Sequence, residues 1–166
     1  MLPGKYFEAI AYEPGKERDI TVDEPSFPFP FDLQLEETNT SNETAMTKVA
    51  DLLDRLPQVR KKAPDYLKER LKKNDGADYP VLDFFISGQI EELDMDEMLK
   101  MGINGLSKEA LNDHLKMTRI ASYYYPGTDE QIIDLDLMFH AEDFTDEILV
   151  VRLSAQGEIL GFVHER

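Results

Sequence analysis

The segment from Thr145 to Arg166, TDEILVVRLSAQGEILGFVHER, constrains the fold more than any other part of the sequence. Ile148–Val151 is an uninterrupted run of β-branched and aliphatic residues, which is typical of a strand covered on both faces. Gly157 is suited to the positive φ that closes a three-residue hairpin loop, and Ile159–Val163 returns as the partner strand. The sequence therefore predicts a β-hairpin, which we expect at the centre of a sheet against which the middle of the chain packs.

Three segments near the N-terminus also have the residue content of strands. Lys5–Tyr12 is rich in aromatic and apolar residues, Asp19–Val22 follows a Pro-Gly turn, and Phe31–Glu36 alternates apolar with polar residues. Phe27–Phe31 alternates phenylalanine with proline, and because proline lacks a ladder donor we expect an edge of the sheet there. Residues 5–36 are therefore predicted to be strands.

The middle of the chain has apolar residues at helical spacing. Thr40 and Glu43 match a capping box, which predicts that a helix begins there. Pro57 is expected at the start of a new helix, and Pro64 is a candidate break in it. Further helices are expected after a cap at Asp78, over Asp96–Met101 and over Lys108–Leu115.

The hydrophobic period changes again near Lys116. Met117–Tyr125 and Gln131–Phe139 read as strands, and in the second of these Asp134 and Asp136 alternate with apolar residues, which predicts a sheet with one wet side. The sequence therefore predicts one α+β domain, residues 1–166, with strands over 5–36, helices over 42–115 and strands over 116–164. We expect a largely antiparallel sheet with the helices packed on one face.

Several of these pieces also occur together in a known family. They are the strand and turn RIASYYYPGTDE, the strand Ile132–Phe139, Thr145-Asp146-Glu147 before Ile148–Val151, the turn Gln156-Gly157-Glu158, and the helix end Gln89–Leu93. Over about residues 28–166 the chain resembles an uncharacterised bacterial family, the domain of unknown function 2004 family. The resemblance implies no activity, cofactor or catalytic residue, and it implies a small acidic intracellular protein, a type common among immunity proteins that neutralise toxins.

The charge of the chain is strongly negative, with 34 acidic and 18 basic residues and a formal net charge of −16. This charge opposes general binding to nucleic acid phosphates, and it favours either simple solubility or a basic protein partner. Arg55–Lys73 is the exception, with eight basic residues against Asp65 and Glu69. Because its lysine pairs are typical of a solvated helix face, we expect no nucleic acid partner.

The composition also bears on the compartment. No cysteine is present, which excludes disulfides, thiolate catalysis and cysteine-ligated zinc. The N-terminus MLPGKYFEAI lacks the apolar core of a signal peptide, and no stretch has the length of a membrane span. We therefore expect a cytoplasmic bacterial protein with no membrane partner.

Asp134, Asp136 and His140 are the candidate catalytic or metal-binding residues. Alternate carboxylates followed by an imidazole suit a divalent cation or a positioned water, which would make the protein a metal-dependent hydrolase. The same pattern is also that of the solvated face of an amphipathic strand. Since GxSxG, Walker and GxGxxG motifs are absent, we favour a protein that is not an enzyme and needs no cofactor or metal.

The favoured function is binding of a basic protein through an acidic surface, in the manner of an immunity protein. Carboxylates concentrate near the end of the predicted helix, and tyrosines adjoin an acidic turn, where an exposed ring would serve as an interface anchor. The expected partner-binding residues are Glu91, Glu92, Asp94, Tyr124, Asp129 and Glu130. Carboxylates at the start of the next helix would also interact favourably with its dipole, and the sequence leaves the oligomeric state open.

Overall fold

The computed structural model describes residues 12–23, 30–73, 76–92, 95–100, 102, 113–125, 127–139 and 146–166. The strands are β1 (Arg18–Val22), β2 (Phe31–Leu35), β3 (Leu115–Tyr124), β4 (Gln131–Phe139), β5 (Ile148–Ser154) and β6 (Ile159–Glu165). The helices within these ranges are α1 (Glu37–Thr40), α2 (Glu43–Lys73), α3 (Tyr79–Glu92) and α4 (Met95–Lys100). Strands, helices and strands follow one another along the chain, which confirms the α+β class.

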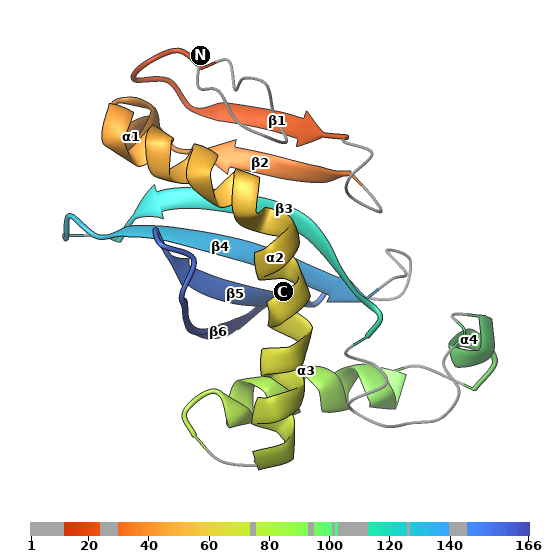
Figure 1. The fold of residues 1–166 in the computed structure, drawn as a ribbon. Coiled ribbons are helices and arrows are strands. Elements are labelled where there is room, and N and C mark those ends of the chain that lie inside the picture. The colour runs from red at the N-terminus through yellow and green to blue at the C-terminus, as the bar shows by residue number, and fades with distance from the viewer. Residues whose placement is uncertain are drawn as a thin grey trace.

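The six strands form one sheet in sequence order, from β1 at one edge to β6 at the other. All neighbouring strands are antiparallel except β2 and β3, which run parallel. The parallel pair follows from the connectivity, because the helical middle of the chain carries it back to the starting end of the sheet. Figure 1 shows α2 crossing one face of the sheet, with α3 beyond the β6 edge.

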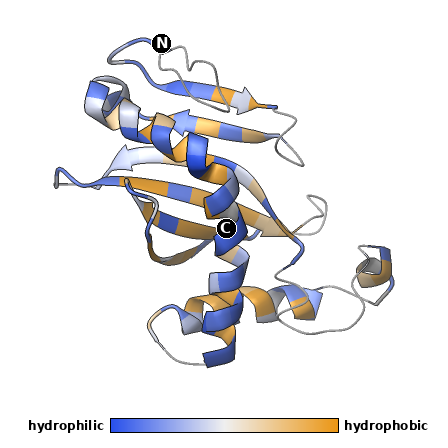
Figure 2. Ribbon diagram, viewed as in Figure 1, coloured by the Kyte–Doolittle hydropathy of each residue, from blue (hydrophilic) through white to orange (hydrophobic). Residues whose placement is uncertain are grey.

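The main core lies between α2 and this face of the sheet. Leu53 and Leu56 of α2 are fully buried, as are Leu135 of β4 and Val151 of β5. The same alternation is visible in Figure 2, where apolar and polar residues succeed one another along the strands. Burial of these aliphatic side chains at about 25 cal/mol per Å² of apolar surface is the main force that holds the helix to the sheet.

Most of the expected elements are present. β1 and β2 coincide with the predicted second and third strands, and Phe31, Leu33 and Leu35 share the buried face as expected. Gly157 has a φ of 82°, and Ser154 and Glu158 close the three-residue loop with a backbone hydrogen bond of 2.9 Å. Most of the strand predicted at Lys5–Tyr12, of the Phe27–Phe31 edge and of the Lys108–Leu115 helix falls outside the described residues. The predicted end of that helix is wrong, because Leu115 is the first residue of β3.

The prediction of a central hairpin is wrong. β5 and β6 lie at the end of the strand order, so β6 is an edge of the sheet and β4 is internal. The uninterrupted apolar run in β5 reflects burial on both faces, but burial of this kind extends to the strand next to the edge. Apolar content alone therefore did not locate the hairpin within the sheet.

The predictions around α2 are wrong in two details. Pro57 and Pro64 both lie inside one continuous helix of 31 residues, which changes direction part way along its length. The prolines remove backbone donors and bend the helix, and burial of its apolar stripe keeps it intact. The cap is Asn42, whose Oδ1 accepts a hydrogen bond from the Ala45 amide at 3.1 Å, whereas the Thr40 hydroxyl donates to the Lys16 carbonyl.

The wet side predicted for β4 is also wrong at its centre. Asp134 and Asp136 are only 6% and 2% exposed, although they alternate with core residues as expected. Long side chains from β3 and β5 lie over them, so the middle of the polar face is shielded from solvent by its own neighbours.

Candidate functional site

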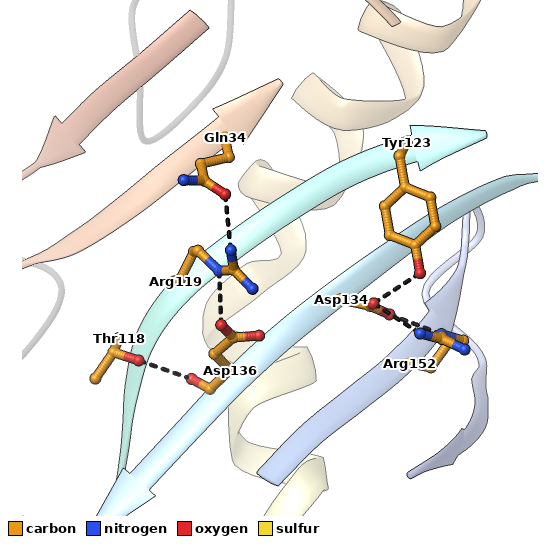
Figure 3. A network of polar contacts seen from close by, with 7 residues as sticks. All are labelled: Gln34, Thr118, Arg119, Tyr123, Asp134, Asp136 and Arg152. Atoms are coloured by element: carbon orange, nitrogen blue, oxygen red, sulfur yellow. Dashed lines mark hydrogen bonds and ion pairs between the residues drawn. The ribbon is translucent and has the colours of Figure 1, made fainter. Parts of the chain in front are cut away.

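Asp134 is held by three hydrogen bonds on the polar face of the sheet. Nε and one terminal nitrogen of Arg152 on β5 each lie 3.0 Å from its carboxylate oxygens, and the Tyr123 hydroxyl on β3 donates to it at 2.7 Å (Figure 3). The Arg152 fork matches the carboxylate geometry, which makes this a strong charge-assisted pair. Both carboxylate oxygens are therefore occupied by donors from the adjacent strands.

Asp136, two residues along β4, is held less completely. Its Oδ2 accepts from Nε of Arg119 at 2.6 Å, and Arg119 also donates to the side-chain oxygen of Gln34 at 2.8 Å (Figure 3). The other carboxylate oxygen, Oδ1, is buried without a hydrogen-bond partner. The two aspartates and two arginines thus form a ladder across β3, β4 and β5, and the ladder has one incomplete position.

Burial dominates the electrostatics of this ladder. Removal from solvent raises the pKa of Asp136 above the ordinary 3.8, and the Arg119 guanidinium opposes that rise. Burial also raises the pKa of Tyr123, and its hydrogen bond to Asp134 adds to the effect. The Tyr123 hydroxyl therefore keeps its proton at neutral pH and serves as a donor to Asp134.

The ladder does not have the arrangement of a hydrolytic metal centre. A cation at Asp134 would have to displace the Arg152 guanidinium, because the fork already occupies both oxygens. His140, the third candidate ligand, falls outside the described residues. Within the described parts of the chain, no three His, Cys, Asp or Glu side chains are grouped to hold a metal ion. The geometry thus supplies no observation in favour of the hydrolase.

A second polar region is an open groove at the end of the sheet where β3 turns into β4. The groove encloses about 1020 Å³. It is lined by Glu37, Thr38, Ser41, Asn42, Thr44, Lys48, Tyr124, Thr128 and Asp129. We call it the turn groove. It contains Tyr124 and Asp129, two of the residues predicted from the sequence to bind a partner.

The walls of the turn groove are fixed by hydrogen bonds. The Asn42 side-chain nitrogen donates to the Tyr124 hydroxyl at 3.1 Å, which links the start of α2 to the end of β3. In the turn, the Tyr125 amide donates to the Glu130 carbonyl at 2.8 Å, and the Thr128 amide donates to the Tyr125 carbonyl at 3.0 Å. These bonds fix the turn that carries Asp129. Tyr125, which is not among the lining residues, is 47% exposed.

A buried polar cluster ties α1 to the sheet near the turn groove. Ser122 donates to the side-chain oxygen of Asn39 at 2.7 Å, and Asn39 donates to the Ser122 carbonyl at 3.0 Å. The Gln131 side-chain nitrogen contacts that same Asn39 oxygen and the Ala45 carbonyl, each at 3.1 Å. Because a buried amide without partners is costly, this cluster fixes α1 and the start of α2 against β3 and β4.

The other predicted partner-binding residues lie elsewhere. Glu91 and Glu92 are exposed at the end of α3, and Asp94 falls outside the described residues. Figure 1 places α3 and the β3–β4 turn at well separated ends of the molecule. The structure therefore divides the predicted surface into two, and only the part at the turn groove combines acidic, hydroxyl and aromatic side chains.

Two further cavities were not predicted from the sequence. One of about 520 Å³ lies between α2 and the β5–β6 turn, where Arg55 donates to the Gln156 carbonyl at 2.9 Å. Its lining mixes Lys62 with Asp65 and Glu69, so its charge favours no particular ligand. The other, of about 190 Å³, adjoins the ion pair of His164 and Glu147 at the α3 face of β6.

The turn groove also includes residues that sequence reasoning missed. Glu37, Asn42 and Lys48 line it, and they come from a part of the chain assigned only to a helix start. A parallel β2–β3 pair brings them beside Tyr124, and nothing in the local sequence indicates that pairing.

The described helices do not include one that is long and apolar enough to cross a membrane. Comparison with models of known protein families, with curated proteins and with solved structures finds no match to this chain.

Proposed function

We propose that this protein binds a basic segment of another protein in the turn groove and performs no catalysis. The observation that carries the proposal is the concentration of exposed carboxylates around the groove. Glu37 and Asp129 line it, and the exposed Glu130 follows Asp129 in the chain but is not among the lining residues. Lys48 is the one basic residue among the described lining residues, and it is half-buried.

The acidic character of the groove extends along its flanks. Glu36 and Glu43 are exposed next to the lining residues Glu37 and Thr44. Complementary charge raises the rate of encounter with a basic partner and disfavours acidic ones. A net charge of −16 on the whole chain acts in the same direction.

An aromatic side chain supplies the apolar contact that charge alone does not. Tyr124 lines the wall of the groove and is half-buried. Tyrosines of this kind are frequent at the energetically dominant positions of interfaces, because a rigid ring buries a large area at a small cost in entropy. We infer a partner segment with lysine or arginine next to an apolar residue.

This mode of action is that of a small acidic protein which neutralises a basic one, as immunity proteins do to toxins. We further propose that it operates in the cytoplasm, since a chain with no cysteine gains nothing from an oxidising compartment.

A titration with a short peptide of lysine and leucine tests the groove as the binding site. NMR amide shifts should move at Tyr125, Thr128 and Asn42, and a glutamate-and-leucine peptide should cause no change. The double variant Glu37→Lys/Asp129→Lys should weaken binding at least about tenfold, since it reverses the two carboxylates that line the groove.

The matched control is Asp146→Lys/Glu158→Lys, which changes the net charge equally at exposed positions away from the groove. Binding to the groove predicts a much smaller loss of affinity in this control. An equal loss in both double variants would mean that the peptide follows the net charge of the molecule, and it would refute the groove as the site.

A further inference from the structure

The exposed face of α3 carries two features that packing within one copy of the chain does not fully account for, although the Phe84 ring lies 5.2 Å from the His164 ring of β6, centroid to centroid. Phe84 is 67% exposed, the largest exposure among the large apolar residues in the described parts of the chain. Gly88 lies one helical turn later, and a Cβ built on it would meet nothing within 4 Å. Glycine inside a helix costs roughly 1 kcal/mol relative to alanine, and no close neighbour in this copy accounts for it.

Phe84 and Gly88 complement each other in shape. Residues four apart lie on the same face of a helix, so the ring of Phe84 stands beside the flat surface at Gly88. If two α3 helices cross in antiparallel fashion about a two-fold axis, each Phe84 faces the Gly88 of the other helix. Such a contact is self-complementary and closes after two copies.

The charges at the two ends of α3 fit the same arrangement. Glu91 and Glu92 are exposed at its C-terminal end. Basic residues of the last turn of α2 lie near its N-terminal end, and one terminal nitrogen of Arg70 is 3.5 Å from the Cβ position of Gly76, three residues before α3. In an antiparallel pair the acidic end of each α3 meets the basic end of its partner, and this happens twice by symmetry.

We propose that α3 is a self-association surface through which two copies of this chain form a two-fold dimer. Phe84 of each copy packs over Gly88 of the other, and Glu91 and Glu92 approach Lys72 and Lys73 of the other copy, where Lys73 also pairs with Glu69 of its own helix. In Figure 1 α3 lies at the end of the molecule away from β1 and the β3–β4 turn, so the dimer leaves the turn groove open. The proposal does not depend on what that groove binds.

Sedimentation equilibrium over a dilution series tests the dimer. The unmodified chain should behave as a dimer that dissociates on dilution, and Phe84→Glu should raise the dissociation constant by about 30-fold or more, as for loss of a central aromatic anchor. Tyr125→Glu is the matched control, because it also replaces an exposed aromatic ring by a carboxylate but lies far from α3. It should leave the dissociation constant unchanged.

Gly88→Leu separates loss of the dimer from loss of folding. Leucine is a better helix former than glycine, and there is open space for its side chain at position 88. The monomeric Gly88→Leu variant should therefore unfold at a higher temperature than the monomeric unmodified chain. The same side chain fills the surface on which the partner's Phe84 would rest, so the dimer should dissociate at concentrations where the unmodified chain does not.

Charge reversal provides a second test. Glu91→Lys/Glu92→Lys and Lys72→Glu/Lys73→Glu should each weaken self-association, because like charges then meet at both ends. Mixed in equal amounts, the two variants should form a heterodimer in which both contacts are again attractive. The proposal is overturned if the unmodified chain is a monomer at every concentration, or if Phe84→Glu or Gly88→Leu dimerises as strongly as the unmodified chain. It is also overturned if mixing the two charge-reversal variants does not restore self-association.

Discussion

Asp134 and Asp136 lie two residues apart on one strand, and their carboxylates are satisfied to different degrees. Asp134 receives three hydrogen bonds from Arg152 and Tyr123, whereas Asp136 receives one from Arg119 and keeps a buried oxygen without a partner. An ion pair with a buried carboxylate contributes to stability only when the remaining lone pairs of that carboxylate are satisfied. The first aspartate therefore stabilises the sheet, and the second is costly in its charged form.

Removal of the Asp134 carboxylate should destabilise the fold strongly. Asp134→Ala leaves the Arg152 guanidinium and the Tyr123 hydroxyl without their acceptor, and we expect a loss of about 3 kcal/mol in the free energy of unfolding. Urea denaturation measures it. Asp32→Ala, an exposed aspartate on β2, should change stability by less than about 0.5 kcal/mol, and equal effects of the two substitutions would contradict the role given to the ladder.

The raised pKa of Asp136 makes stability depend on pH in a defined direction. The folded state holds this proton more tightly than the unfolded chain does, so folding takes up a proton between the two pKa values. The contribution of Asp136 is therefore greatest below 3.8, its ordinary pKa, and is lost as the pH rises through the folded value. In Asp136→Asn this loss is absent.

We expect the unfolding free energy of Asp136→Asn minus that of the unmodified chain to increase with pH above about 3.8, because other titrating groups cancel in the difference. Urea denaturation at a series of pH values measures it. Arg119→Met removes the cation that opposes the shift, so it should move the pH-dependent loss to higher pH. A difference that stays flat or decreases with pH would show that the Asp136 pKa is not raised.

At the scale of elements, the β5–β6 hairpin is tied to the sheet by its strands and to α2 by its turn. Gly157 at the turn approaches the helix so closely that a Cβ there would stand 3.3 Å from a methyl group of Leu52. Arg55, one turn later, donates to the Gln156 carbonyl at 2.9 Å. The turn therefore serves as a contact between the edge of the sheet and the helix, as well as a reversal of the chain.

Gly157→Ala should lower stability by about 2 kcal/mol, measured by urea denaturation. Alanine pays the cost of a φ of 82° and also crowds Leu52, which is itself fully buried. Gly127→Ala is the matched control, because its φ of 78° is similar but a Cβ there would meet nothing within 4 Å. If the two substitutions lower the free energy of unfolding equally, the turn does not pack against α2 as described.

Local patterns predicted most of these elements, since each depends on residues close in sequence. The alternation in Phe31–Leu35, the turn at Gly157 and the span of β4 were all recognisable. The continuity of α2 through Pro57 and Pro64 was not, because burial against the sheet outweighs the local preference of proline.

Features set by strand order or by neighbouring strands could not be predicted. Three features depend on which strands pair. They are the edge position of the hairpin, the burial of Asp134 and Asp136, and the proximity of Glu37 to Tyr124. Pairs such as Asp134 with Arg152 lie 18 positions apart in the chain, and no local period marks them.

At the scale of the molecule, charge is separated between surfaces. Carboxylates surround the turn groove, whereas α2 carries the basic residues of Arg55–Lys73 toward its far end. The sequence predicted an acidic binding surface, but the structure divides its residues between the turn groove and the end of α3. This division leads to our two separate proposals, a partner at the groove and a second copy of the chain at α3.

The measurement that tests the proposed binding function most directly is site-specific photo-crosslinking in cells of the source organism. A photoreactive aromatic residue replaces Tyr124 in the wall of the groove or, as a control, the exposed Leu160 on β6. We expect a protein with a basic segment to be crosslinked from position 124, little or nothing to be crosslinked from position 160, and the product to be lost in Glu37→Lys/Asp129→Lys. Equal crosslinking from both positions, or a product that survives the charge reversal, would contradict the account.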